Sequence, residues 1–221
     1  MSLEALLDSS HAAASPQLRN EPVQARSTAR LAALLDAAAA VVDEIGYERL
    51  TTAMVADNAG ASIGTVYRYF PDRIAVLQAL GARNLERVLQ RATDEIVDVR
   101  HSNWAEALGA AFGILVDAFR HERGFRSLRV GDVIDLRPPA GTRTYNSIVA
   151  ESLHAGLVSR FDVSNTAEAQ FAFETAIEVS DSLASRAFAL DADGDQAFLD
   201  ASRDIVFSML VKHFGAPTNA A

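Results

Sequence analysis

The sequence predicts an all-α protein with an N-terminal three-helix unit, which contains a helix-turn-helix, and a larger C-terminal helical bundle. Three observations support this fold class. Apolar residues recur at helical spacing through most of the chain, no segment shows the alternation of a half-buried strand, and two short helical patterns are joined at Gly60. With 221 residues, 49% of them hydrophobic, the chain can bury a sizeable core in one large or two small domains.

Composition divides the chain into three parts. Residues 1–22 are rich in alanine and serine, contain two prolines, and are predicted to form a flexible N-terminal arm. Residues 23–83 form the predicted helix-turn-helix domain. Its first helix is expected from Thr28 to Ile45, because the apolar residues share one helical face and Gly46 follows them. Residues 84–221 form the predicted C-terminal domain.

The stretch from Thr51 to Phe70 has the pattern of a helix-turn-helix. The hydroxyls of Thr51 and Thr52 are suited to cap a first short helix. The buried residues of that helix are expected to be Val55, Ala56 and Ala59. Gly60 ends it, since glycine adopts the left-handed conformation needed just past a helix without a Cβ penalty.

Ser62 is the expected N-cap of the second helix, which is predicted from Ile63 to Phe70. Val66 and Phe70 are four residues apart and are expected to face inward. The outward-facing residues are then Ile63, Gly64, Tyr67 and Arg68. A small side chain at Ala56 and Ala59 allows the two short helices to approach closely.

The rest of the chain is expected to be helical. Pro71 ends the second short helix, and Asp72 is placed to cap a long helix that continues to about Ile96 and joins the two domains. After the capping residue Asn103, the next helix contains two glycines, which indicate close helix contact or room for another group. Further helices are predicted at Phe125 to Val130, Arg143 to Ser159, Ala167 to Leu190, and Gln196 to Phe214.

Charge and cysteine content limit the classes of function. The net charge is −9, and most of the acidity lies behind the helix-turn-helix, which is close to neutral in sum. Binding of DNA phosphates would thus depend on where individual arginines lie. The absence of cysteine excludes disulfides and thiolate metal sites. No apolar run resembles a secretion signal or a membrane span, so a cytoplasmic protein is expected, with no membrane partner.

Three sequence patterns could suggest a hydrolase or a metal site, but each lacks a feature that the site requires. Residues 60–64 match the G-x-S-x-G nucleophile elbow, but the elbow needs a preceding strand, and here a helix is predicted. The acidic turn at 191–195 lacks the calcium-loop spacing. The histidines never pair at metal-ligand spacing. The sequence therefore predicts no catalytic residues, no metal, no cofactor and no enzyme activity.

The segment from Leu31 to Arg73 resembles the tetracycline-repressor (TetR) family of bacterial transcription factors. The resemblance includes the amphipathic first helix, Gly46-Tyr47, and the run TTAMVADNAGASIGTVYRYF ahead of Arg73. Two positions depart from the usual pattern: Ala53 stands where some relatives carry a basic residue, and Arg73 stands where lysine is usual. The resemblance implies a sequence-specific repressor that a small apolar effector releases from DNA.

A reading helix in this arrangement enters the major groove, which places Ile63, Gly64, Tyr67 and Arg68 near base edges. Ile63 is suited to contact thymine methyl groups, and Arg68 is the single charged residue on this face. The family pattern implies phosphate contacts at Thr52, Thr65, Tyr69 and Arg73. The predicted DNA-binding residues, with the N-cap included, are Thr52, Ser62, Ile63, Gly64, Thr65, Tyr67, Arg68, Tyr69 and Arg73. Arg19, Arg26 and Arg30 are further candidates to contact the backbone or the minor groove, although the acidic residues of the arm favour a solvated tail.

The C-terminal domain is expected to bind the effector and to form a homodimer. Aromatic residues there fill a core or line an apolar pocket, and the resemblance favours a pocket. The pocket candidates are Phe112, Leu115, Phe119, Phe125, Leu128, Phe173 and Ile177. The last two helices are apolar on two sides, and a second apolar side needs a partner. The expected dimer residues are Phe171, Thr175, Val179, Ser182, Arg186, Phe198, Ile205 and Met209.

A twofold dimer implies double-stranded DNA with a palindromic operator. In an alternative to the dimer, the segment from Gly131 to Gly141 covers the apolar side. Two other functions remain open: a helical protein-interaction domain with a non-functional helix-turn-helix, and an α-helical hydrolase. Sequence-selective DNA binding separates the first from a regulator, and ester turnover identifies the second.

Overall fold

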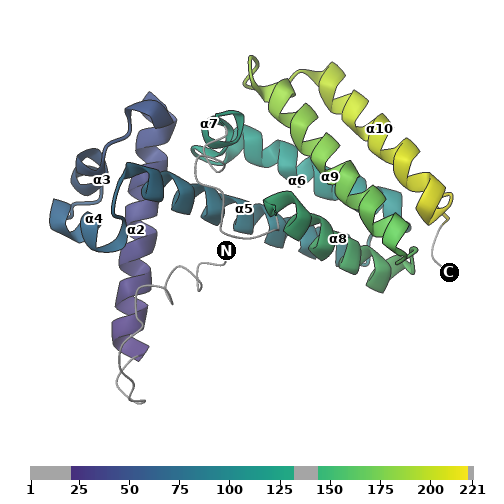
Figure 1. Cartoon of the computed structure of the whole chain (residues 1–221), viewed down its shortest axis with the longest axis horizontal. Helices are drawn as coiled ribbons and strands as arrows, with labels where there is room; N and C mark the ends of the chain where they lie inside the picture. The colour runs from purple at the N-terminus through teal and green to yellow at the C-terminus, as the bar shows by residue number, and fades with distance from the viewer. Residues whose placement is uncertain (1–20, 132–143, 219–221) are drawn as a thin grey trace. The chain divides into compact units, whose positions relative to one another are not determined.

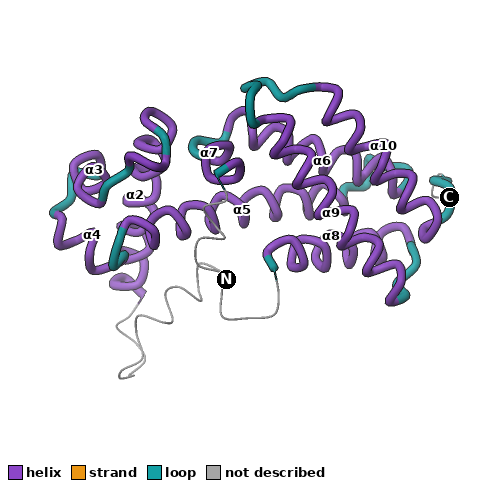
Figure 2. Tube along the Cα trace, turned by 45° about the horizontal axis from the view of Figure 1, so that its top comes forward, coloured by secondary structure: helices purple, strands orange, loops and turns teal. Residues whose placement is uncertain are grey.

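The computed structural model describes residues 21–131 and 144–218. Within these residues the structure consists of helices and loops without a strand, in agreement with the predicted fold class (Figure 2). The helices are α2 (Glu21–Ile45), the 3-10 helix η1 (Tyr47–Arg49), α3 (Thr52–Asn58), α4 (Ile63–Tyr69), α5 (Arg73–Val97), α6 (Trp104–His121), α7 (Phe125–Val130), α8 (Tyr145–Phe161), α9 (Ala167–Phe188) and α10 (Gln196–Phe214). No helix in the described ranges is long and apolar enough to span a membrane.

The described residues form two compact units. The first contains residues 21–86 and 123–131, and the second contains residues 87–122 and 144–218. The division within α5 falls between residues 86 and 87, three residues beyond the predicted boundary at 83/84, and α7 belongs to the first unit. The predicted arm lies almost entirely outside the described residues, as does the segment proposed to cover the apolar side of the last two helices.

Most helix ends agree with the sequence prediction, and the main difference lies in α2. This helix begins at Glu21, whereas the prediction began at Thr28. Pro22 does not prevent the earlier start, because the first turn of a helix does not need the amide N–H that proline lacks. Helix α8 begins after Thr144, whose side chain accepts a hydrogen bond from the Ser147 amide at 3.1 Å.

The first unit packs α3, α4 and the start of α5 against the long helix α2 (Figure 1). Its largest fully buried side chains include Leu34, Leu35 and Leu50. Helix α7 joins this core through Leu128. Its position depends on Gly124, which has a φ of 74° and where an added Cβ would lie only 3.2 Å from Cγ1 of Val42. Glycine thus allows the chain to turn against α2 before α7 begins.

The second unit contains the end of α5 with α6, α8, α9 and α10. Helices α9 and α10 run side by side in opposite directions, joined by a short turn (Figure 1). The turn needs glycine, because Gly194 has a φ of 85° and an added Cβ would lie 2.6 Å from Cζ of Phe188. Gly156 lets α8 approach α5 closely, since its added Cβ would lie 3.1 Å from Cγ2 of Ile96.

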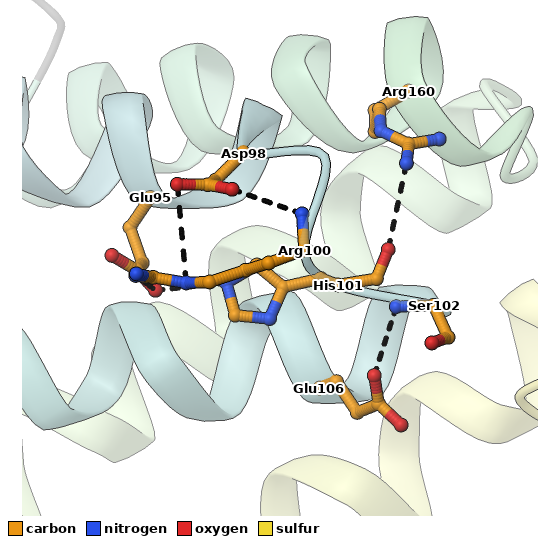
Figure 3. A network of polar contacts seen from close by, with 7 residues as sticks. All are labelled: Glu95, Asp98, Arg100, His101, Ser102, Glu106 and Arg160. Carbon is orange, nitrogen blue, oxygen red and sulfur yellow. Dashed lines mark hydrogen bonds and ion pairs between the residues drawn. The ribbon is translucent and has the colours of Figure 1, made fainter.

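Polar contacts fix the loop between α5 and α6 (Figure 3). The Glu95 carboxylate accepts a hydrogen bond from Arg100 and lies 2.8 Å from Nε2 of His101. The pKa of Glu95 lies below its usual value, chiefly because the Arg100 guanidinium donates to it. Arg160 on α8 reaches the His101 carbonyl at 3.5 Å. The C-terminal end of α5 is thereby connected through this loop to α8.

Candidate nucleic-acid interface

N-caps define the starts of α3 and α4, and a glycine lies in the turn between them, as the sequence predicted. The Thr51 hydroxyl accepts a hydrogen bond from the Met54 amide at 3.2 Å and caps α3. Gly60 has a φ of 58°, in the left-handed region. The Ser62 hydroxyl accepts a hydrogen bond from the Thr65 amide at 3.2 Å and caps α4. Ser62 thus follows a helix and serves as an N-cap, which is not the strand-to-helix setting of a hydrolase nucleophile.

The two faces of α4 are those that the spacing predicted. Val66 and Phe70 are buried in the core of the first unit. The side chains of Ile63 and Tyr67 are 43% and 54% exposed, and Gly64 and Arg68 are exposed as well. The solvent-facing side of α4 therefore consists of the residues predicted to reach base edges.

The residues predicted to contact phosphates also hold the first unit together. The Thr52 hydroxyl donates to the Tyr67 hydroxyl at 3.3 Å, and so links α3 to α4. The Tyr69 hydroxyl lies 3.2 Å from the Ser27 hydroxyl of α2. Arg73 donates to the Glu48 carbonyl at 2.6 Å from an exposed position. Thr65 is half-buried, and its hydroxyl is 2.9 Å from that of Ser62.

Three described arginines of the first unit are exposed on α2 and α4. Arg26 and Arg30 are exposed on the first turns of α2. The guanidinium of Arg68 lies 5.3 Å from the centre of the Tyr69 ring, within the range of a cation–π contact. Arg19 lies outside the described residues. This sparse arrangement fits the near-neutral charge of the region.

The sequence pattern did not predict two features of this unit. Met54 on α3 is 40% exposed, although a methionine in a short helix is more often assigned to the core. Arg83 on α5 is buried and contacts α2. Its position offered a signal, because Arg83 falls three residues after Leu80 and four after Ala79, on the buried side of an amphipathic helix. A charged residue on that side needs partners in the fold.

The seven predicted pocket residues do not form one site within either unit. Phe125 and Leu128 are buried in the first unit, because α7 packs there, and the other five lie in the second. Of those five, Phe119 stacks on Phe188 with ring centres 4.7 Å apart, and Phe173 and Ile177 belong to the main core. Phe112 and Leu115 are half-buried on α6. An added Cβ at Gly109 or Gly113 meets no atom within 4 Å, so these glycines leave open space and do not mark close helix contact.

The predicted dimer residues lie on a continuous side of α9 and α10. Every one of them is exposed or half-buried within the single chain, with Phe171 72% exposed. An open groove of about 540 Å³ lies on this side, lined mainly by apolar atoms from α9 and α10, with Phe171, Thr175 and Met209 among its residues. Arg186 covers the Phe198 ring, with its guanidinium carbon 4.6 Å from the ring centre.

A capped helix-turn-helix with a solvent-facing second helix, followed by a separate all-helical unit, defines a helical DNA-binding regulator. Comparison with known families agrees: residues 102–214 match "Tetracyclin repressor-like, C-terminal domain", and residues 34–80 match "Bacterial regulatory proteins, tetR family". The chain belongs to the tetracycline-repressor family of DNA-binding transcriptional regulators.

Individual relatives and solved structures are similar to the chain to different extents. A TetR-family regulator from Streptomyces coelicolor is 29% identical, with a TM-score of 0.68 over 83% of this chain and 99% of its own. A TetR-family regulator from Pectobacterium atrosepticum shares the fold at 18% identity, with a TM-score of 0.66 over 91% of this chain and 100% of its own. The transcriptional repressor KstR of Rhodococcus jostii is 40% identical over 58 residues, which are 26% of this chain and only 27% of that repressor's length.

Proposed function

We propose that the protein is a repressor that binds a palindromic operator as a homodimer and leaves it when a small apolar effector binds. One observation carries the proposal: the segment that matches the regulatory family displays a solvent-facing α4 made of the predicted reading residues. A helix that turns Ile63, Tyr67 and Arg68 toward solvent and buries its opposite side in the core is suited to the major groove.

The DNA contacts divide into two groups. Ile63, Gly64, Tyr67 and Arg68 would face base edges, because they occupy the exposed side of α4. The remaining candidates, which would hold the backbone, are Thr52, Ser62, Thr65, Tyr69, Arg73, Arg26 and Arg30. Since the chain is acidic overall, we expect weak non-specific binding with a shallow salt dependence.

The homodimer would use the exposed side of α9 and α10. Phe171, Val179 and Ile205 present apolar surface that the single chain does not cover. A symmetric partner would cover it with the same residues, and would give the two reading helices twofold symmetry. This symmetry is the reason for expecting a palindromic operator.

The effector would bind in the second unit. Five of the original candidates remain there: Phe112, Leu115, Phe119, Phe173 and Ile177. The half-buried residues Phe112 and Leu115 are better placed to contact a ligand than the fully packed Phe173. Because α5 is one continuous helix from Arg73 to Val97, an effector that favours one position of its C-terminal end would also bias its N-terminal end. We place the protein in the cytoplasm, where a bacterial operator is found.

In vitro selection of random duplex DNA with the purified full chain, followed by sequencing, tests this function. We expect a single enriched motif with two inverted half-sites. Enrichment of no motif would overturn the proposal and favour the protein-interaction alternative. Tyr67→Ala is the comparison variant, because it removes an exposed side chain from the reading face. We expect this variant to stay folded and to lose the enrichment, which would assign the selected motif to α4.

A further inference from the structure

The exposed side of α4 consists of two strips with different chemistry. Ile63 and Tyr67 are one helical turn apart and form an apolar strip, 43% and 54% exposed. Gly64 and Arg68, also one turn apart, form the second strip. On binding to DNA, each strip would therefore face its own part of the groove.

The hydroxyl groups near these strips are already engaged within the protein. The Ser62 hydroxyl contacts both the amide and the hydroxyl of Thr65. The Tyr67 hydroxyl accepts a hydrogen bond from Thr52 at 3.3 Å, which also holds the ring in place. Apart from the O–H group of Tyr67, which can still donate a hydrogen bond, the first strip presents hydrocarbon to DNA, from the Ile63 side chain and the Tyr67 ring.

A hydrocarbon surface has one complementary feature in the major groove. Donors and acceptors on the base edges gain nothing from an isoleucine, whereas the 5-methyl group of thymine packs against it. Ile63 and Tyr67 are separated by four residues, a rise of about 6 Å along the helix axis. Stacked bases are about 3.4 Å apart, so the strip spans positions one or two steps apart on the DNA.

The second strip explains how the first can reach the bases. An added Cβ at Gly64 would meet only Oγ of Ser62, at 3.8 Å, so the fold itself leaves room for a side chain there. Because glycine has no side chain, nothing at position 64 projects from the helix surface beside Arg68. A low surface brings α4 close to the groove floor, where short side chains such as Ile63 make contact.

Building on the proposed operator binding, we propose that Ile63 and Tyr67 determine specificity by reading the 5-methyl groups of thymines within each half-site. In each operator half-site, we therefore expect thymine at one or two positions next to the base pair that Arg68 contacts. Guanine is the expected partner of Arg68, because arginine pairs with its O6 and N7 atoms.

Replacement of thymine by deoxyuridine tests this directly, since the exchange removes the methyl group and leaves base pairing intact. The probe is the operator duplex selected with the full chain, with each thymine replaced in turn, and affinity is measured by fluorescence anisotropy at fixed salt. We expect one or two thymines per half-site at which the exchange weakens binding about fourfold, the value of one buried methyl group. Loss of under twofold at every thymine would overturn the inference.

The variant Ile63→Ala tests which of the sensitive thymine methyl groups contacts Ile63. The methyl that contacts Ile63 should lose its effect in this variant, while a second sensitive thymine keeps its effect. Ile63 is exposed and alanine favours a helix more than isoleucine, so the variant should fold, which circular dichroism checks. Leu190→Ala, an exposed apolar change in the second unit, is the matched control and should keep the full uridine sensitivity.

An Ile63→Ala variant as sensitive as the unaltered protein at every thymine would overturn the assignment to this residue. Failure of the inference and failure of the proposed function are distinguishable. If no operator is selected at all, the proposed function fails. If an operator is selected but is insensitive to uridine, operator binding stands and the methyl reading fails.

Discussion

Arg83 on α5 and Asp36 on α2 form an ion pair, with 2.7 Å between Nη1 of the arginine and Oδ1 of the aspartate. The same guanidinium donates to the backbone carbonyls of Ala32 at 3.4 Å and Leu35 at 3.3 Å. It therefore lies directly against the α2 backbone. Arg83 is buried, whereas the Asp36 side chain is 66% exposed, so the two partners contribute unequally.

We expect Arg83→Met to lower the free energy of unfolding by about 2 kcal/mol, because methionine keeps the packing but loses the charged hydrogen bonds to α2. Asp36→Asn should cost less than about 1 kcal/mol, since an exposed carboxylate gains little from an ion pair. Urea unfolding followed by circular dichroism compares the two. Equal costs would show that the ion pair dominates and that the contacts with the α2 backbone matter little.

Gly64→Ala should separate folding from DNA binding. The added Cβ has room, and alanine in a helix is favoured over glycine by up to about 1 kcal/mol, so the melting temperature should stay the same or rise. Operator affinity should fall at least tenfold, because the methyl group raises the surface in front of Arg68. Anisotropy titrations measure the affinity. A stable variant with unchanged affinity would contradict a close approach of α4 to the groove.

Arg68 and Arg73 should differ in how their loss affects DNA binding. Arg68→Ala is expected to weaken the operator and to relax selectivity at one base pair. Arg73→Ala should weaken all sequences alike and reduce the salt slope by about one. Because Arg73 also donates to the Glu48 carbonyl, its replacement should in addition lower stability slightly. Competition titrations at several salt concentrations distinguish the two patterns, and an identical pattern for both variants would contradict the assignment.

Most of the helix-turn-helix could be predicted because its determinants are local. Thr51, Gly60 and Ser62 lie directly beside the helix ends that they define, so the caps and the inward-facing positions followed from spacing alone. The position of α7 depends instead on the close approach of the chain at Gly124 to Val42, which is far away in the sequence. Helical periodicity carries no information about which unit a short helix joins, and for this reason Phe125 and Leu128 were grouped with residues of the other unit.

Acid should destabilise the second unit through His154. This buried histidine packs against both Phe173 and Phe214, with ring centres 5.4 and 5.6 Å away. Burial lowers the pKa of His154 below its ordinary value of 6.5, against the opposing effect of its contact with the Ser164 carbonyl. The unfolded chain therefore binds this proton more readily than the folded chain, and stability falls as the pH drops below about 6.5.

We expect the melting temperature to fall between pH 7.5 and 5.5, and expect His154→Phe to remove most of this fall. Calorimetry at a series of pH values measures it. The carboxylates of Glu95 and Asp117 do not interfere, because their pKa values are lowered from ordinary values of 4.5 and 3.8, and the stability that they provide is lost only at still lower pH. A variant with the same pH dependence as the unaltered protein would exclude His154 as the cause.

A charge on the exposed side of α9 or α10 should prevent dimer formation. Val179 is half-buried and Ile205 is 42% exposed in the single chain, so glutamate at either position is tolerated by one subunit. In a symmetric dimer each substitution appears twice at one interface, and two carboxylates would lose hydration without gaining a partner. We therefore expect Val179→Glu and Ile205→Glu to be folded monomers at micromolar concentration by light scattering. Operator binding should weaken strongly in both, because the two half-sites would no longer be held by one assembly.

Leu190→Glu is the matched control, since Leu190 is 88% exposed and lies beyond the end of α9. It should remain a dimer with full operator affinity, and a dimer that persists in both interface variants would refute this interface.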